Sequence, residues 1–264
     1  MEFVLQRDAE NVVAMRWLAA IYYDQGDLLQ TITLLERIRD LDPADSRSVW
    51  LLGTIHRDLD KLDEAIAAFR ESLRREPHPV KEIDLRVELA ECLFKQQSHA
   101  DVLQALHGFD ASAAVALKFE ALVGLGQAQE AIALLDTALA KDPAHLGLLR
   151  LRGEHYLQSG DIKEAVRVLE AVVRESPSDF RSRTNLALAY EQLGRSADAE
   201  VQHQKVKETL NLFQKVHDKG REAMNDPWDG RVRLEMAELC ERIDRPELAR
   251  MWRRAAEACR TPNL

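Results

Sequence analysis

The residues that could carry out chemistry are spread along the chain without the spacing that an active site needs. The eight histidines stand singly, with no HExxH motif and no paired ligands at helical spacing. The acidic residues within 58–64 resemble a calcium loop but lack its glycine and its final glutamate. No phosphate loop, nucleophile elbow or Cys/His pair is found either. We therefore expect no enzyme, no metal site and no cofactor.

The composition indicates a helical protein and narrows the class of partner. Of the 264 residues 46% are hydrophobic and 31% are charged, which suits neither a disordered nor a membrane-spanning chain, and glycine and proline are scarce for a β-rich fold. The net charge of −9 repels a phosphate backbone, so nucleic acid is not the expected partner. Three cysteines without CxxC spacing and an N-terminus unlike a signal peptide predict a cytoplasmic protein without membrane insertion.

Proline closes an apolar helical stretch at four places along the chain. These are Pro43, Pro77, Pro143 and Pro177, separated by 34, 66 and 34 residues, and 66 is close to twice 34. A fixed period of this length is typical of stacked helix pairs. We predict repeats at about 12–45, 46–79, 83–111, 112–145, 146–179, 180–195 continuing into a long helix to 225, and 228–262, with 1–10 as a cap or the remnant of a preceding repeat.

The same residue types recur at the same offsets within this register. Leucine, a small residue and an aromatic residue follow one another in the first helix as Leu18, Ala19 and Tyr22, and the small residue lets two helices cross closely. The turn to the second helix needs a residue that adopts the left-handed conformation. The chain supplies Gly26, Gly126, Gly160 and Gly194 there, with Asp60 and Asp244 in equivalent places and Gln97 in the atypical third repeat.

This pattern resembles the tetratricopeptide repeat family over nearly the whole chain. The resemblance implies an all-α fold, a solenoid of antiparallel helix pairs stacked into a right-handed superhelix. It also implies a scaffold or adaptor that binds a peptide or a partner protein in the concave groove lined by the first helix of each pair. The alternative is that the chain is the recognition or regulatory arm of a larger multidomain enzyme whose catalytic domain lies outside it.

The family's groove positions can be carried over to this chain residue by residue. The implied groove is basic at its N-terminal end and more acidic beyond. Trp50 has a second interpretation, as a core residue that replaces the tryptophan expected at Val49, and Trp17 is expected to pack against the second repeat. The groove residues implied in this way are Arg16, Tyr23, Arg47, Trp50, Arg57, Glu91, Glu120, Arg150, Glu154, Arg181 and Glu191.

Two further surfaces have alternative interpretations. The long helix, at 197–225, carries an apolar stripe that includes Phe213, and this stripe either packs on neighbouring helices or forms a homo-oligomer seam or a docking face. On the last helix, Arg250, Arg253 and Arg254 share one side. They form either the polar outer face of a terminal repeat or a docking site for an acidic segment.

Overall fold

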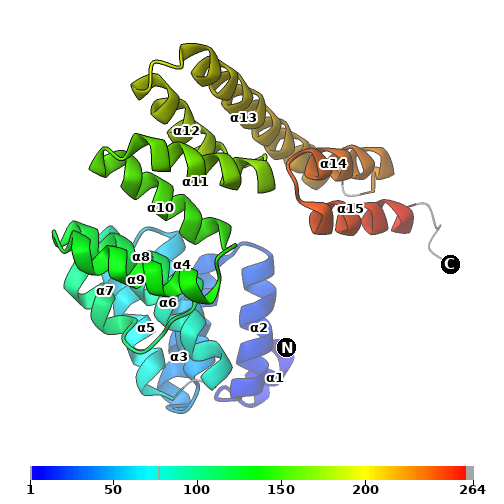
Figure 1. The fold of residues 1–264 in the computed structure, drawn as a ribbon. Helices are drawn as coiled ribbons and strands as arrows, with labels where there is room; N and C mark the ends of the chain where they lie inside the picture. The colour runs from blue at the N-terminus through cyan, green and yellow to red at the C-terminus, as the bar shows by residue number, and fades with distance from the viewer. Residues whose placement is uncertain (1, 77, 227, 260–264) are drawn as a thin grey trace. The chain divides into compact units, whose positions relative to one another are not determined.

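The computed structural model describes residues 2–76, 78–226 and 228–259. Over these residues the chain is built from fifteen helices without a strand (Figure 1). It divides into two compact parts, Met1–Lys141 and Asp142–Leu264. The first part holds α1 (Glu2–Arg7), α2 (Val12–Asp24), α3 (Leu28–Leu41), α4 (Ser46–Asp58), α5 (Leu62–Arg74), α6 (Pro79–Lys95), α7 (His99–Ala105), α8 (Ser112–Gly124) and α9 (Ala128–Lys141). The second holds α10 (Leu146–Ser159), α11 (Ile162–Glu175), α12 (Phe180–Gln192), α13 (Ser196–Asn225), α14 (Gly230–Arg242) and α15 (Pro246–Ala258).

From α2 onward, the helices form consecutive pairs. We call the first helix of each pair the A helix and the second the B helix. Each pair packs on the next one within its part, so the buried residues form successive clusters along the chain. One cluster joins α2, α3 and α4 around Met15, Ile38 and Leu52. Another joins α5 to α8, and further clusters lie in the second part. This arrangement is the all-α solenoid that the repeat pattern predicts.

Helix starts and turns follow from local residue chemistry. Asn11, Asp27, Asp45, Asp179 and Asp229 precede helices, and their side chains accept hydrogen bonds from backbone N–H groups of the first turn. The predicted left-handed residues at the turns between A and B helices are confirmed, because each has a positive φ angle. They are Gly26, Gly126, Gly160, Gly194, Asp60, Asp244 and, in the third pair, Gln97.

Close crossing of the paired helices depends on residues that lack a side chain. A Cβ added to Gly53 in α4 would lie 2.5 Å from the ring of Phe69 in α5. A Cβ on Gly153 in α10 would lie 2.6 Å from Cδ2 of Leu169 in α11. Both Phe69 and Leu169 are fully buried, so neither has free space to move into. The glycines therefore set the distance between the two helices of these pairs.

Helix α13 is the longest helix among the described residues, at 30 residues, whereas the other B helices have at most 14. The part of α13 up to Phe213 packs against α12, and the ring centroids of Phe180 and Phe213 are 6.1 Å apart. The second half of α13 packs against α14, through Val216 and through Gly220, which lies next to Met236. Figure 1 shows α14 and α15 at the C-terminal end of α13. One helix thus supports two consecutive A helices.

Candidate functional site

The A helices of the first part carry seven of the implied groove residues, which we call the A-helix face. Arg16 and Tyr23 lie on α2; Arg47, Trp50 and Arg57 on α4; Glu91 on α6; and Glu120 on α8. Ion pairs and hydrogen bonds hold part of this face, so some of its charges are already neutralised within the chain.

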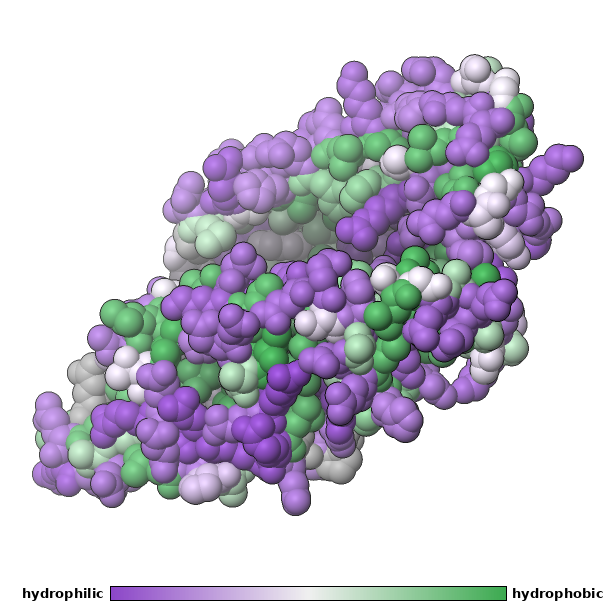
Figure 2. All heavy atoms as spheres, turned by 90° about the vertical axis from the view of Figure 1, so that its left-hand side faces the viewer, coloured by the Kyte–Doolittle hydropathy of each residue, from purple (hydrophilic) through white to green (hydrophobic). Residues whose placement is uncertain are grey.

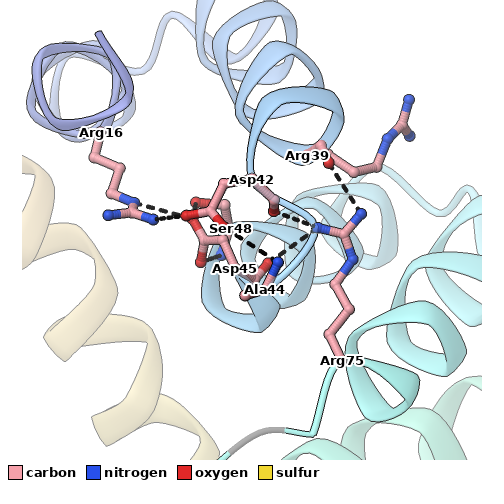
Figure 3. A network of polar contacts seen from close by, with 7 residues as sticks. All are labelled: Arg16, Arg39, Asp42, Ala44, Asp45, Ser48 and Arg75. Carbon is pink, nitrogen blue, oxygen red and sulfur yellow. Dashed lines mark hydrogen bonds and ion pairs between the residues drawn. The ribbon is translucent and has the colours of Figure 1, made fainter.

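Arg16 is anchored by acidic residues of the loop that leads into α4. Its guanidinium donates from Nε to Asp45, at 3.0 Å, and from one terminal nitrogen to Asp42, at 2.8 Å (Figure 3). Asp45 in turn accepts hydrogen bonds from the backbone N–H and the hydroxyl of Ser48. Burial alone would raise the pKa of Asp45, but the hydrogen bonds from Ser48 and Arg16 outweigh it, and the net pKa is lowered. Asp45 therefore stays ionised and positions Arg16.

The same loop is held from the other side by Arg75, at the end of α5. Its guanidinium donates to the backbone carbonyls of Arg39, at 3.0 Å, and Asp42, at 2.9 Å, which lie at the C-terminal end of α3 (Figure 3). Arg75 also pairs with Glu71, one turn earlier. A cation at this position satisfies carbonyls that the helix leaves unpaired. The loop between the first two helix pairs is therefore clamped by arginines on both sides.

A second network joins α4 to α6. One carboxylate oxygen of Glu88 accepts hydrogen bonds from the hydroxyl of Thr54, at 3.1 Å, and from Arg57, at 3.0 Å. Glu91 lies one turn further along α6 and is exposed. Surrounding protein atoms nevertheless displace water from it and raise the pKa of its carboxyl; Arg57 opposes this rise, and the like charge of Glu88 adds to it.

Three residues of the face differ in their availability to a partner. Tyr23 is 39% exposed, and Arg47 is exposed and forms no ion pair within the described residues. Trp50 is half-buried against the core cluster of α5 to α8, and its indole Nε1 is buried without a hydrogen-bond acceptor. The core interpretation of Trp50 is thus favoured over a fully exposed position in a groove.

The second part carries the remaining implied groove residues. Arg150 and Glu154 form an ion pair of 2.7 Å within α10, and the amide of Asn185 on α12 donates to Glu154. On α12, Arg181 is exposed, and Glu191 contacts His203 of α13 at 2.8 Å. The contact between Glu154 and Asn185 matches that between Thr54 and Glu88, because in both cases one A helix contacts the next.

The two surfaces with alternative interpretations are only partly engaged inside the chain. On α13, Phe213 packs on Phe180, whereas Leu210 and Met224 are exposed. On α15, Arg250 pairs with Glu247 and Arg253 with Glu241, whereas Arg254 is exposed. These contacts favour packing for Phe213 and ordinary solvated ion pairs for two of the arginines.

One expectation from the sequence was wrong. Trp17 does not pack against the second repeat but is 59% exposed. It lies on α2 one turn after Val13 and one turn before Ile21, on a different side from the buried Ala14 and Leu18. Sequence reasoning also missed the anchoring of Arg16. The available signal was the pair of aspartates, Asp42 and Asp45, in the loop before α4.

Comparison with known proteins places the chain in a family. The tetratricopeptide repeat profiles match residues 18–79, 51–113, 122–181 and 156–206. The chain belongs to the tetratricopeptide repeat proteins, whose stacked helix pairs serve in general as protein-interaction scaffolds and typically lack catalytic activity.

Individual relatives are distant, and they are longer than this chain. The chain is 27% identical over 210 residues to DnaJ homolog subfamily C member 3 of Gallus gallus, covering 80% of the chain and 38% of that protein. It is 24% identical over 206 residues to human tetratricopeptide repeat protein 16, covering 76% of the chain and 21% of that protein. The chain thus spans well under half the length of these two relatives.

Solved structures share the fold at low sequence identity. A tetratricopeptide repeat protein from Parabacteroides merdae aligns with a TM-score of 0.64 and 17% identity, covering 96% of this chain and 94% of that one. An IFIT1 monomeric mutant, solved with Gppp-AAAA, aligns with a TM-score of 0.50 and 14% identity, covering 87% of this chain and 67% of that one. The fold by itself therefore does not exclude a nucleic-acid ligand.

Two other classes of site were searched for in the described part of the chain. There, histidine, cysteine and acidic side chains do not gather into a group of three or more that could hold a metal ion. Nor does any described helix combine the length and the apolar character needed to cross a membrane.

Proposed function

We propose that this chain is a scaffold or adaptor that binds a peptide or a segment of a partner protein on the A-helix face of its first part. The observation that carries the proposal is the availability of Tyr23 and Arg47 on neighbouring A helices, whose other groove arginines, Arg16 and Arg57, are already paired. Tyrosine and arginine are enriched among the residues that dominate binding energy. Arg47 is exposed and forms no ion pair with another described residue, so an acidic group of a partner could bind it without breaking an existing ion pair.

The fixed arginines on the same two helices support the proposal. Asp42 and Asp45 hold Arg16, and Glu88 holds Arg57, so these long side chains are ordered before a partner arrives. Binding then immobilises fewer side chains, which lowers its entropic cost. Glu91, crowded but accessible, offers an acceptor further along the same face.

The proposal names a protein rather than a nucleic acid as the partner. The net charge of −9 opposes the approach of a phosphate backbone, and the arginines Arg16 and Arg57 are neutralised by internal carboxylates. Figure 2 shows one side of the molecule, on which hydrophilic residues predominate and hydrophobic residues lie between them.

A second candidate function rests on the length of the relatives. The chain covers 38% and 21% of the two curated proteins described above, so repeats of this kind occur inside longer proteins. We propose as the alternative that the chain acts as the recognition or regulatory arm of a larger multidomain enzyme. In that case the A-helix face would bind the substrate protein or a regulatory segment.

The test is to capture binding proteins with the immobilised chain, identify them by mass spectrometry, and titrate the purified partner. The double variant Tyr23→Ala with Arg47→Ala should weaken binding by about 10-fold or more, because two exposed contact residues are lost. Arg74→Ala is the matched control, since Arg74 is exposed on a B helix. Unchanged affinity in the double variant would remove the A-helix face as the binding site, and capture of RNA without protein would remove the protein-binding proposal.

A further inference from the structure

The N-terminal ends of α4 and α6 place two cations beside one indole ring. Arg47 is the second residue of α4, and Trp50 follows it three residues later, so the two are neighbours on the helix surface. From α6, the Nζ atom of Lys81 lies 5.9 Å from the centre of the Trp50 ring, a distance at which the ring attracts a cation. We call Arg47, Trp50 and Lys81 the cationic site.

Both cations of this site are available to a partner. Arg47 is exposed and forms no ion pair with another described residue. The Nζ atom of Lys81 lies 3.4 Å from a carboxylate oxygen of Asp84, and both of these side chains are more than half exposed. An exposed ion pair contributes little to stability, so a carboxylate of a partner can join or replace Asp84 at small cost. With Asp84 included, the two cations still leave an excess of positive charge.

Further along α6, Glu91 offers the opposite charge. Its side chain is exposed, yet surrounding protein atoms displace water from its carboxyl and raise the pKa, which Arg57 and Lys95 oppose only in part. Arg57 is itself engaged by Glu88 and Asp58, at N–O distances of 3.0 and 3.1 Å. A basic side chain of a partner would supply the positive charge that the carboxylate of Glu91 lacks.

The distance between these two places determines the spacing of the charges that fit them. Lys81 and Glu91 are ten residues apart on α6, which corresponds to about 15 Å along the helix axis. An extended peptide advances about 3.3 Å per residue, so four residues span about 13 Å, and the flexible side chains of Lys81 and Glu91 cover the remainder. Residues four apart in an extended segment also point to the same side, whereas residues five apart point to opposite sides.

We infer that the partner segment is extended and carries an acidic side chain that binds the cationic site and, four residues away, a basic side chain that binds Glu91. This inference rests on the proposed function, because it names the class of peptide that the A-helix face selects. Two charges of opposite sign also distinguish a protein partner from a nucleic acid, whose backbone offers only the negative one. Complementary charges of this kind fix the register of a bound segment and exclude wrong partners.

A random decapeptide library displayed on phage and selected on the full chain tests the inference. We expect the selected peptides to be enriched in an acidic and a basic residue four positions apart. The most enriched peptide is then synthesised with a fluorescent label, and its affinity is measured by fluorescence anisotropy.

Charge reversal in the chain and in the peptide identifies the contacts. Arg47→Glu should weaken binding about 10-fold or more, because it brings like charges together, and a peptide whose acidic residue is changed to lysine should recover part of the loss. Glu91→Lys should weaken binding in the same way, with recovery by a peptide whose basic residue is changed to glutamate. Arg74→Glu and Glu64→Lys are the matched controls, since both residues are exposed on the B helix α5, and at physiological salt neither should change the affinity by more than about 2-fold.

The outcomes separate this inference from the proposed function. Selected peptides that lack the pair of charges, or whose affinity neither Arg47→Glu nor Glu91→Lys changes, overturn the inference. Binding that Tyr23→Ala still weakens would then keep the A-helix face as the binding site. If no peptide is selected, the inference fails as well, and capture of a protein by the immobilised chain would still support the proposed function. Where a charge reversal lowers the helical circular dichroism, Arg47→Gln or Glu91→Gln replaces it, and unchanged affinity in that folded variant refutes the inference equally.

Discussion

Replacing Gly153 by alanine tests the packing argument most directly, because two effects of known sign oppose each other. Alanine is favoured over glycine in a helix interior by about 1 kcal/mol. The new Cβ, however, would lie 2.6 Å from Cδ2 and 2.7 Å from Cγ of Leu169, about 1 Å closer than carbon atoms normally approach. Overfilling a packed core costs about 1–3 kcal/mol. We therefore expect Gly153→Ala to lower the free energy of unfolding of the second part by up to about 2 kcal/mol.

Gly220→Ala is the matched control, because it makes the same change inside a helix of the same part. A Cβ there would meet only Cε of Met236, at 3.6 Å, an ordinary contact. This variant should gain about 0.5–1 kcal/mol from helix propensity alone. The difference between the two variants then isolates the steric cost of the crossing between α10 and α11.

Urea denaturation followed by circular dichroism measures both variants. The double variant Gly153→Ala with Leu169→Ala should be less destabilised than the sum of the single changes, because the shortened side chain makes room for the new methyl group. If Gly153→Ala proves as stabilising as Gly220→Ala, the two helices do not cross as closely as described, and the reasoning from Gly153 fails.

Two further predictions concern the turns and the loop before α4. Gln97 has a φ angle of 60°, a left-handed conformation that costs a residue with a side chain about 1 kcal/mol. Gln97→Gly should therefore raise the melting temperature measured by circular dichroism. A lower melting temperature in this variant would refute the strain argument. The pKa of Asp45 is lowered in the folded chain, so ionised Asp45 stabilises the fold. This stabilisation is fully present at pH values above the pKa of an aspartate in the unfolded chain, about 3.9. It is lost as the pH falls through the lower pKa that Asp45 has in the folded chain. Asp45→Asn should reduce the free energy of unfolding at pH 7 by about 1–2 kcal/mol and show a weaker loss in acid, and parallel pH profiles for both proteins would contradict the assignment.

The sequence predicts the fold well because its local signals and its packing signals agree. The turn residues, such as Gly160 and Asp60, adopt the left-handed conformation that their types suggest. Gly153, at the predicted helix crossing, lies against Leu169, which is itself four residues after the small Ala165. These features repeat at a fixed period, so each repeat supports the register of the others.

The candidate site is less predictable because exposure depends on neighbours that are distant in sequence. Trp17 and Trp50 are both tryptophans on A helices, yet one is exposed and the other half-buried. The difference arises because Trp50 packs against the cluster that α5 to α8 form, whereas Trp17 lies on a different side of α2 from the buried Ala14 and Leu18. Likewise, Arg16 is not free to bind a partner, because it pairs with aspartates that lie 26 and 29 residues further along the chain. The repeat period locates such residues but does not set their partners.

The long helix α13 has a consequence for how this chain can tolerate insertions. The residues of α13 that pack on α12 and α14, among them Ala199, Phe213 and Gly220, follow one slowly winding side of the helix. Each inserted residue rotates everything beyond it by about 100°, whereas seven residues restore nearly the same phase. A single extra residue midway along α13 would therefore rotate α14 and α15 about the axis of α13. An insertion of seven residues would shift them along that axis and keep nearly the same orientation. The orientation of α14 and α15 therefore depends on the number of residues in α13.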